Sequence, residues 1–388
     1  MILPAGFRAA LPFAAFYGAV FLAMGIYLPF WPVFLEHRGL TAAEIGWVLA
    51  LGTWAKTAVA PIIGHISDRT GQRRLVLAAL AGIALLAASG YHFAAGFMAI
   101  LAVHLIVFPA FQATIPLGES HCMAAVREQG LDYGRLRLWG SLAFILGVLG
   151  IGELLAEHSA EMVLWGLMGS FALLLLVTLA LPKARRPEDR HGRAPILALI
   201  GDRNFLIFLV IGALLQSSHA VYYSFSAVHW QAAGHSAATV GWLWSEGVIA
   251  EVALFALGAA LLHRLGPVGL LATAAIAGVL RWTVLAETTA LPALVGVQAL
   301  HAFTFGAAHL GAMHYIARRA PPGLQATAQG LYGAVSGGIG MGLALLLAGT
   351  LYEAMAGRAF HAMAAMSLVG GLLTIVLLAR ERSRNRKD

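Results

Sequence analysis

The chain has 388 residues, of which 60% are hydrophobic and only 11% are charged, and its mean hydropathy is +0.80. A water-soluble domain carries about a quarter charged residues, so this composition excludes one and indicates a membrane protein. Basic residues outnumber acidic residues by 25 to 18, and the single Cys122 excludes a disulfide framework within the chain.

Apolar stretches long enough to cross a bilayer recur along the whole chain. A hydrocarbon core about 30 Å thick needs about 20 apolar residues per helix. Runs such as 173–176 lack the alternation of apolar and polar positions that a membrane barrel requires. The sequence therefore predicts an all-α integral membrane protein with twelve transmembrane helices. They are expected at 11–35, 44–66, 75–91, 96–120, 133–157, 160–181, 205–230, 238–262, 267–288, 291–317, 324–352 and 358–380.

Basic residues are unevenly divided between the two sides of the membrane. With the N-terminus placed inside, the outside loops hold only Arg38 and Arg358, and the spans hold only Lys56 and Arg281, so 21 of the 25 basic residues are cytoplasmic. The positive-inside rule then predicts a bacterial inner-membrane protein with both termini in the cytoplasm. We interpret the basic segment 183–203 and the basic tail as topological anchors, and not as nucleic-acid-binding segments.

A repeated segment indicates that the chain contains two copies of one plan. Gly39–Trp47 reads GLTAAEIGW, and Gly234–Trp242, 195 residues later, reads GHSAATVGW. Repetition at half the chain length is the signature of an internal duplication.

The longest polar interruption divides the twelve spans six and six. We therefore expect two pseudo-symmetric six-helix halves, at 1–181 and 204–388, joined by a cytoplasmic linker at 182–203.

A charged motif follows the second span and reads GHISDRTGQRR over 64–74. Parallel six-helix repeats with this motif between helices 2 and 3 resemble the major facilitator superfamily. A glycine at 71 permits a sharp turn there. The resemblance implies that Asp68 meets the positive N-terminus of helix 11, near Gly323, as an ionic latch. The alternative is a charged turn with no gating role. The expected gate residues are Gly64, Asp68, Arg69, Gly71, Arg73 and Arg74.

Five further stretches resemble the 3-phenylpropionate permease family of proton-coupled transporters, which is similar to the lactose permease. They are Tyr27–Trp31, Leu131–Ser141, His219–Ser226, His229–Gly234 and Gly278–Trp282.

The lactose permease pattern implies roles for two pairs of residues. Glu119 and Arg137 match its substrate-binding carboxylate and arginine, and Arg281 and His301 match its helix 9 arginine and helix 10 histidine. Three residues after that histidine the permease has a proton-carrying glutamate, whereas this chain has Thr304. Proton coupling therefore needs another group.

Charges near the bilayer centre cost at least about 2.5 kcal/mol each, so they must be paired, hydrated or functional. Lys56 and Glu251 lie mid-span 195 residues apart, which makes them equivalent positions of the two halves. The two residues either act in transport or form a static structural ion pair. Glu246 lies on a different helix face from Glu251. Arg281, also mid-span, either acts in transport or is a snorkelling or locally paired cation.

Histidines and aromatic residues supply further candidates. His301 and His309 share one helix face, and His219 belongs to a polar run that suggests an aqueous cavity along helix 7. Each histidine either binds or relays protons or is a hydrogen-bonded packing residue. Four tyrosines could stack on an aromatic ring of a substrate, namely Tyr17, Tyr27, Tyr222 and Tyr223. Trp31 and Trp230 suit either this role or the membrane interface. No ligand set for a metal is recognised.

We expect a secondary transporter that works by alternating access, and the sequence has no Walker A motif through which ATP would drive it directly. The leading interpretation is proton symport of an aromatic carboxylate such as 3-phenylpropionate, with Glu251 as proton carrier and Glu119 in reserve. Lys56, Arg137 or Arg281 would attract the anion. Alternatives are a sugar or nucleoside proton symporter and a drug efflux transporter. An enzyme is not expected. The expected partners are the substrate, the proton and the lipid bilayer, with no cofactor, metal or nucleic acid, and the chain is expected to be a monomer.

Overall fold

The computed structural model describes residues 5–183, 197–321 and 323–384, and within these ranges the chain is helical without strands. Eleven segments of this part are long and apolar enough to cross a membrane. The last one, Gln325–Ser383, has 59 residues and is interrupted by a 3₁₀ turn at Ala356–Ala359. It therefore supplies the last two of the twelve expected spans. The all-α membrane fold is confirmed.

Two compact units make up the chain. One unit comprises Met1–Asp189 and Trp230–Ser245, and the other comprises Arg190–His229 and Glu246–Asp388. We refer to them as unit 1 and unit 2. The linker expected at 182–203 and the end of the basic tail lie largely outside the described residues, and the boundaries of the two halves stay a prediction.

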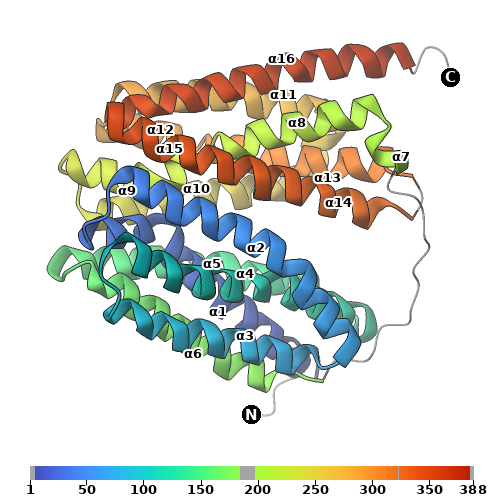
Figure 1. The fold of residues 1–388 in the computed structure, drawn as a ribbon. Coiled ribbons are helices and arrows are strands. Elements are labelled where there is room, and N and C mark those ends of the chain that lie inside the picture. Colours follow the sequence, from blue (N-terminus) through green and yellow to red (C-terminus); the bar gives the residue numbers. More distant parts are fainter. Residues whose placement is uncertain (1–4, 184–196, 322, 385–388) are drawn as a thin grey trace. The chain divides into compact units, whose positions relative to one another are not determined.

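Long helices that pack side by side form the first part of the chain (Figure 1). α1 packs mainly on α5 and α6, and α4 packs on both α2 and α3. Thr41 caps α2 through a capping box with Glu44, and Asp132 caps α5 through the Arg135 N–H. The helices are α1 (Ala5–His37), α2 (Ala42–Thr70), α3 (Arg73–Ala88), the 3₁₀ turn η1 (Ser89–His92), α4 (Gly96–Gln129), α5 (Tyr133–Glu157) and α6 (Glu161–Ala180).

The second part of the chain repeats this pattern of long helices. α11 packs mainly on α16 and α13, and α8 packs on α16. Two stretches, η2 and η3, are π-helical. The elements are α7 (Leu197–Ile200), α8 (Arg203–Ser217), α9 (Ala220–Ala232), α10 (Ala237–Ala256), α11 (Gly258–Glu287), α12 (Leu291–Gln298), η2 (Ala302–Ala307), α13 (Ala308–Arg319), α14 (Gln325–Tyr332), η3 (Gly333–Gly340), α15 (Met341–Met355), η4 (Ala356–Ala359) and α16 (Phe360–Arg384).

The eighth and ninth spans were expected at 238–262 and 267–288, and the backbone leaves the helical conformation between them. Gly266 has φ +66° and ψ 173°, directly before Pro267. Proline has no N–H to donate and glycine tolerates this φ, so a turn forms there. α10 ends at Ala256, and the helical segment that begins at Gly258 leads to this turn.

Candidate functional site

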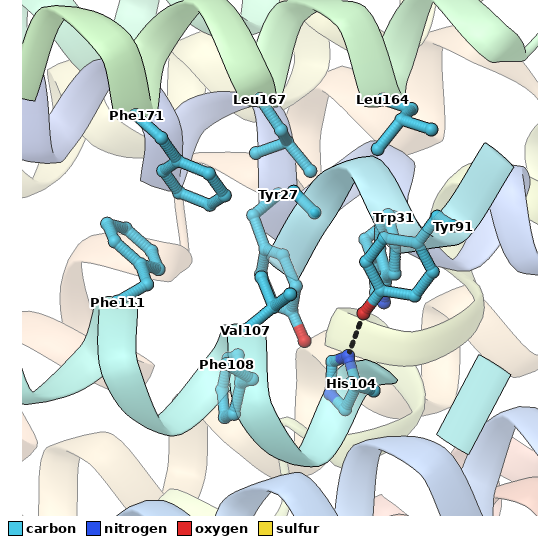
Figure 2. A pocket seen from close by; sticks show the side chains of 11 residues that line it. Tyr27, Trp31, Tyr91, His104, Val107, Phe108, Phe111, Leu164, Leu167 and Phe171 are labelled. Carbon is cyan, nitrogen blue, oxygen red and sulfur yellow. Dashed lines mark hydrogen bonds between the residues drawn. The ribbon is translucent and has the colours of Figure 1, made fainter. Parts of the chain in front are cut away.

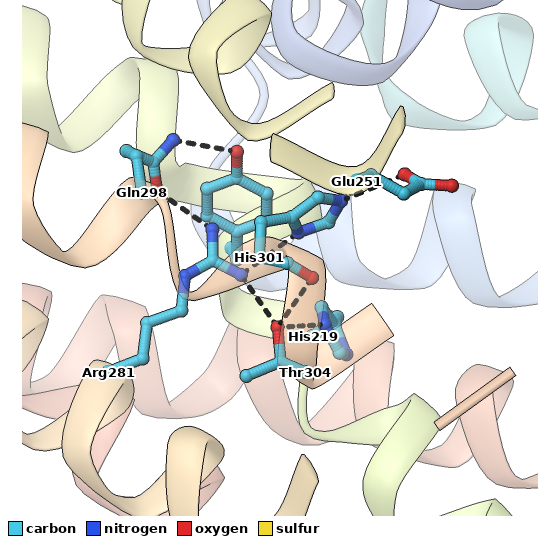
Figure 3. A network of polar contacts seen from close by, with 7 residues as sticks. His219, Glu251, Arg281, Gln298, His301 and Thr304 are labelled. Carbon is cyan, nitrogen blue, oxygen red and sulfur yellow. Dashed lines mark hydrogen bonds and ion pairs between the residues drawn. The ribbon is translucent and has the colours of Figure 1, made fainter. Parts of the chain in front are cut away.

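A fully buried arginine organises a polar network in unit 2 (Figure 3). Arg281 projects from α11 and is 0% exposed. Its Nη1 donates to His301 Nδ1 and to Thr304 Oγ1, each at 3.0 Å, and its Nη2 donates to Gln298 Oε1 at 2.7 Å. The guanidinium also lies 4.5 Å from the centre of the Tyr222 ring. Arg281 therefore points into the protein as a locally paired cation and does not snorkel, and its role in transport stays a prediction.

Hydrogen bonds define the tautomer of one histidine in this network. A guanidinium only donates, so His301 Nδ1 accepts and its proton lies on Nε2. His219 Nδ1 lies 3.2 Å from the carbonyl oxygens of Leu215 and Gln216, so this nitrogen donates. The Thr304 hydroxyl accepts from Arg281 and lies 3.2 Å from His219 Nε2 and 3.4 Å from the His301 carbonyl oxygen. His301 is therefore neutral in this arrangement.

A carboxylate lies at the outer end of the network. Glu251 on α10 places Oε2 3.7 Å from His301 Nε2, the nitrogen that carries the imidazole proton. The groups that accept directly from Arg281 are an imidazole, a hydroxyl and a carboxamide, and each of them is neutral. The network thus holds a buried cation in neutral hydrogen bonds, with an acid one imidazole away.

Aromatic rings extend this network along two helices. Phe305 stacks on His301 at 5.6 Å and on His309 at 6.3 Å, which confirms that the two histidines share a face even though η2 is π-helical. Tyr223 stacks on His219 at 5.4 Å. The structure therefore brings together the expected site residues of the seventh, ninth and tenth spans. Glu251, the expected site residue of the eighth span, joins them from α10.

Unit 1 contains a second cluster, in which rings stack around a buried histidine (Figure 2). Tyr27 lies 5.0 Å from Phe108 and 5.8 Å from Trp31, measured between ring centres. His104 stacks on Phe108 at 5.1 Å, and its Nδ1 lies 3.1 Å from the Tyr91 hydroxyl. His104 is 1% exposed. The sequence did not single out this histidine.

Trp31 and Trp230 are both buried, at 1% and 0% exposure. Their alternative placement at the membrane interface is therefore wrong. The sequence position of a tryptophan near the end of a span is compatible with the membrane interface and with the protein interior. Its packing in the folded chain determines which of the two it occupies.

The remaining intramembrane charges of unit 1 lie beside aromatic rings. The Lys56 ammonium is 5.7 Å from the centre of the Phe108 ring, and Lys56 is half-buried. Glu119 Oε2 accepts a hydrogen bond from the Tyr17 hydroxyl at 2.6 Å, and the Arg137 guanidinium lies 5.9 Å from the centre of the Tyr17 ring. Glu119 and Arg137 are thus linked through Tyr17.

The motif between α2 and α3 forms the expected sharp turn. Gly71 has a φ of +64°, and its N–H donates to the Ser67 carbonyl at 2.9 Å. Arg73 contacts Asp68 at 3.4 Å, and Arg74 donates to the Leu181 carbonyl at 3.3 Å, which ties the turn to the end of α6. Asp68 and Arg69 are exposed. The ionic latch between Asp68 and the N-terminus of the eleventh span, near Gly323, stays a prediction.

Sequence reasoning missed two members of the unit 2 network as site residues. Gln298 and Thr304 stand where the lactose permease has a lysine and a glutamate, so the sequence presented them only as departures from that pattern. Positions 298 and 304 lie three residues before and after His301, so helical spacing already places them on its face. This spacing was the signal that could have found them.

Comparison with known proteins identifies the family. The family model described as the MFS_1 like family matches residues 11–362. The chain belongs to the MFS_1 like family. This MFS_1 like chain is 38% identical to the probable 3-phenylpropionic acid transporter of Escherichia coli K12 over 361 residues, which cover 91% of this chain and 93% of that protein. It is 32% identical to the maltose permease of Geobacillus stearothermophilus, over 96% of this chain and 95% of that permease.

The fold agrees with this assignment. The crystal structure of the nucleoside transporter NupG superposes with a TM-score of 0.85 at 18% identity, and the match covers 95% of this chain and 99% of that one. The MFS_1 like chain is a multi-pass membrane protein and a major facilitator secondary transporter of a small molecule. Its relatives are transporters and not enzymes.

Proposed function

We propose that this protein imports an aromatic monocarboxylate, with 3-phenylpropionate as the leading substrate, in symport with protons. The observation that carries the proposal is the network around the fully buried Arg281, in which Arg281 donates to His301 and His301 faces Glu251. The 38% identical relative, whose name specifies 3-phenylpropionic acid, supports the choice of substrate.

Glu251 is the proton carrier in this mechanism. Arg281 occupies His301 Nδ1 and cannot give up its proton, so His301 stays a neutral donor toward Glu251. Protonation of Glu251 removes the negative charge that faces His301. Because an ionised carboxylate is much more costly to bury than a neutral one, the protonated carrier favours closure of the loaded transporter. Glu119 is the reserve carrier.

The other expectations complete the proposal. The protein lies in the bacterial inner membrane as a monomer with both termini in the cytoplasm, and the motif at 64–74 acts as its gate. The geometry of the motif supports this role, since a left-handed Gly71 and the Arg74 bond to the end of α6 hold a rigid turn beside the exposed Asp68.

Uptake into proteoliposomes under an imposed pH gradient tests the coupling. Each pH unit drives one proton with about 1.4 kcal/mol, which is about tenfold accumulation of a substrate carried with one proton. Glu251→Gln should abolish accumulation and retain exchange of labelled for unlabelled substrate. Glu246→Gln is the matched control on α10 and should accumulate normally. Uptake that stays unchanged when the pH gradient is collapsed contradicts proton coupling. Accumulation retained by both Glu251→Gln and Glu119→Gln contradicts the assignment of the proton carriers.

A sugar is the second candidate substrate. Glu119, Tyr17 and Arg137 place a carboxylate and a guanidinium on one aromatic ring, an arrangement able to bind hydroxyl groups over an apolar sugar face. The 32% identical maltose permease supports this alternative. A thermal-shift comparison of 3-phenylpropionate with maltose and a nucleoside separates the candidates, since stabilisation by maltose alone replaces the aromatic acid with a sugar.

A further inference from the structure

The two units carry the same arrangement around a buried histidine on their fourth helix. Three positions of unit 1 have an equivalent position 195 residues later in unit 2, and two have one 197 residues later. The pairs are Tyr27 and Tyr222, Gly52 and Gly247, Lys56 and Glu251, His104 and His301, and Phe108 and Phe305.

The contacts within each arrangement also correspond. A phenylalanine one turn along stacks on each histidine, at 5.1 Å for His104 and 5.6 Å for His301. A Cβ added at Gly52 or at Gly247 would meet the histidine ring of its own unit. Each Nδ1 is bound from the preceding helical segment, by the Tyr91 hydroxyl at 3.1 Å in unit 1 and by Arg281 at 3.0 Å in unit 2.

The arrangements differ in what the remaining polar atoms contact. In unit 2, Gln298 donates to the Tyr222 hydroxyl at 3.0 Å, and Glu251 faces His301 Nε2. In unit 1 the position 197 residues before Gln298 is Leu101, and the position equivalent to Glu251 is Lys56. In the arrangement around His104, the Tyr27 hydroxyl, Trp31 Nε1 and His104 Nε2 are buried without a hydrogen-bond partner among the described residues.

These groups are suited to a negatively charged partner. When the Tyr91 hydroxyl donates to His104 Nδ1, His104 Nε2 carries the proton and becomes a donor, as do the Tyr27 hydroxyl and the Lys56 ammonium. A buried polar atom in a native protein normally has a partner, and donors beside a cation fit a carboxylate. No carboxylate of unit 1 occupies the position that Glu251 has in unit 2, because that position is Lys56.

The space around His104 limits how a ligand approaches. The cavity bordered by Tyr27, Trp31, Tyr91 and His104 has a volume of about 10 Å³ (Figure 2), enough for a group of the size of one water molecule and too small for a phenyl ring. His104 Nε2 points toward α2, where a Cβ at Gly52 would lie 2.6 Å away. The absence of a side chain at Gly52 therefore lets the imidazole pack closely against α2, one turn before Lys56.

We propose that Tyr27, Lys56 and His104 form the carboxylate-binding half-site of unit 1, in which the substrate carboxylate takes on His104 Nε2 the place that Glu251 takes on His301 Nε2. The inference rests on the proposed function in one respect, namely that the substrate is an anion. It adds His104 as a substrate-binding residue and separates the group that binds the substrate carboxylate from the network around Glu251.

Binding of an acid and its neutral amide to the full-length protein tests the half-site. The probes are 3-phenylpropionate and 3-phenylpropionamide, measured by calorimetry at pH 7 with Tyr27→Phe, His104→Phe and Lys56→Met. Each variant should weaken acid binding about 10-fold or more, as loss of a hydrogen bond to a charged group predicts, and should change amide binding much less. Tyr332→Phe, at a buried tyrosine of unit 2 stacked on Phe208, is the matched control and should keep the wild-type ratio.

The outcomes separate this inference from the proposed function. An acid-to-amide ratio that stays at the wild-type value in all three variants overturns the half-site and leaves the proposed substrate intact. Wild-type protein that binds benzoate but not 3-phenylpropionate, with a benzoate-to-benzamide binding ratio that falls in the variants, supports the half-site and refutes the proposed substrate. Lys56→Met changes a half-buried side chain, so it provides the test if either ring variant fails to fold.

Discussion

Replacing Thr304 by valine tests whether the neutral hydrogen bonds around Arg281 support this buried cation. The hydroxyl accepts from Arg281 at 3.0 Å and shares a hydrogen bond with His219 Nε2 at 3.2 Å. A hydrogen bond to a charged group contributes about 1.5–3 kcal/mol in water-soluble proteins, whereas interhelical hydrogen bonds in membranes contribute about 0.6 and at most about 1.7 kcal/mol. With two bonds lost and a buried charge affected, we expect the free energy of unfolding to fall by about 2 kcal/mol.

Thr374→Val is the matched control for this substitution. Thr374 is also buried, at 1% exposure, but its hydroxyl donates to the Gly370 carbonyl of its own helix at 2.7 Å. We expect a loss below about 1 kcal/mol there. Unfolding of the purified protein in mixed micelles, followed by tryptophan fluorescence, measures both. Equal losses for the two variants would refute the reasoning, because they would show that Arg281 gains nothing from Thr304.

Three further predictions concern unit 1. Gly71→Ala places a side chain at a φ of +64°, so we expect about 1 kcal/mol lower stability and slower transport in proteoliposomes, and an unchanged rate would contradict the gate. Tyr17→Phe removes the hydroxyl that donates to Glu119 at 2.6 Å. In titration calorimetry this variant should bind a sugar more weakly and 3-phenylpropionate as tightly as the wild type. The reverse result would exclude the sugar site. Arg38→Ala breaks the partly exposed ion pair with Glu161 at 2.7 Å and should lower the free energy of unfolding by at most about 1 kcal/mol. A thermal melt should therefore show a small decrease in Tm. A large decrease would contradict the small contribution of an exposed ion pair to stability.

Hydropathy and charge bias were enough to predict the fold. The spans follow from apolar length, and the turn at Gly71 follows from glycine's tolerance of positive φ. The non-helical backbone at Gly266 lies between the expected eighth and ninth spans, and the short interruption at Leu257 has no signal in hydropathy. The pairing of Arg281 with His301 came from family resemblance, since residues 20 positions apart on two helices have no local signal of contact.

The contacts that define each site were less predictable. Thr304 lies inside a π-helical stretch, and a sequence does not show where such a stretch begins. His104 was passed over because its contacts with Tyr91 and Phe108 depend on packing between helices. The offsets of 195 and 197 residues are present in the sequence, but the correspondence of His104 with His301 becomes visible only when both rings are placed.

The repeated histidine arrangement has an evolutionary consequence. In a symmetric dimer of a single six-helix chain, one mutation changes both copies, so a lysine in one copy and a glutamate in the other cannot coexist. Once two copies are fused in one gene, each position drifts separately. Lys56 and Glu251 are opposite charges at positions 195 residues apart. A chain that holds both copies can therefore carry two sites of opposite charge at equivalent positions, which a symmetric dimer of one chain cannot.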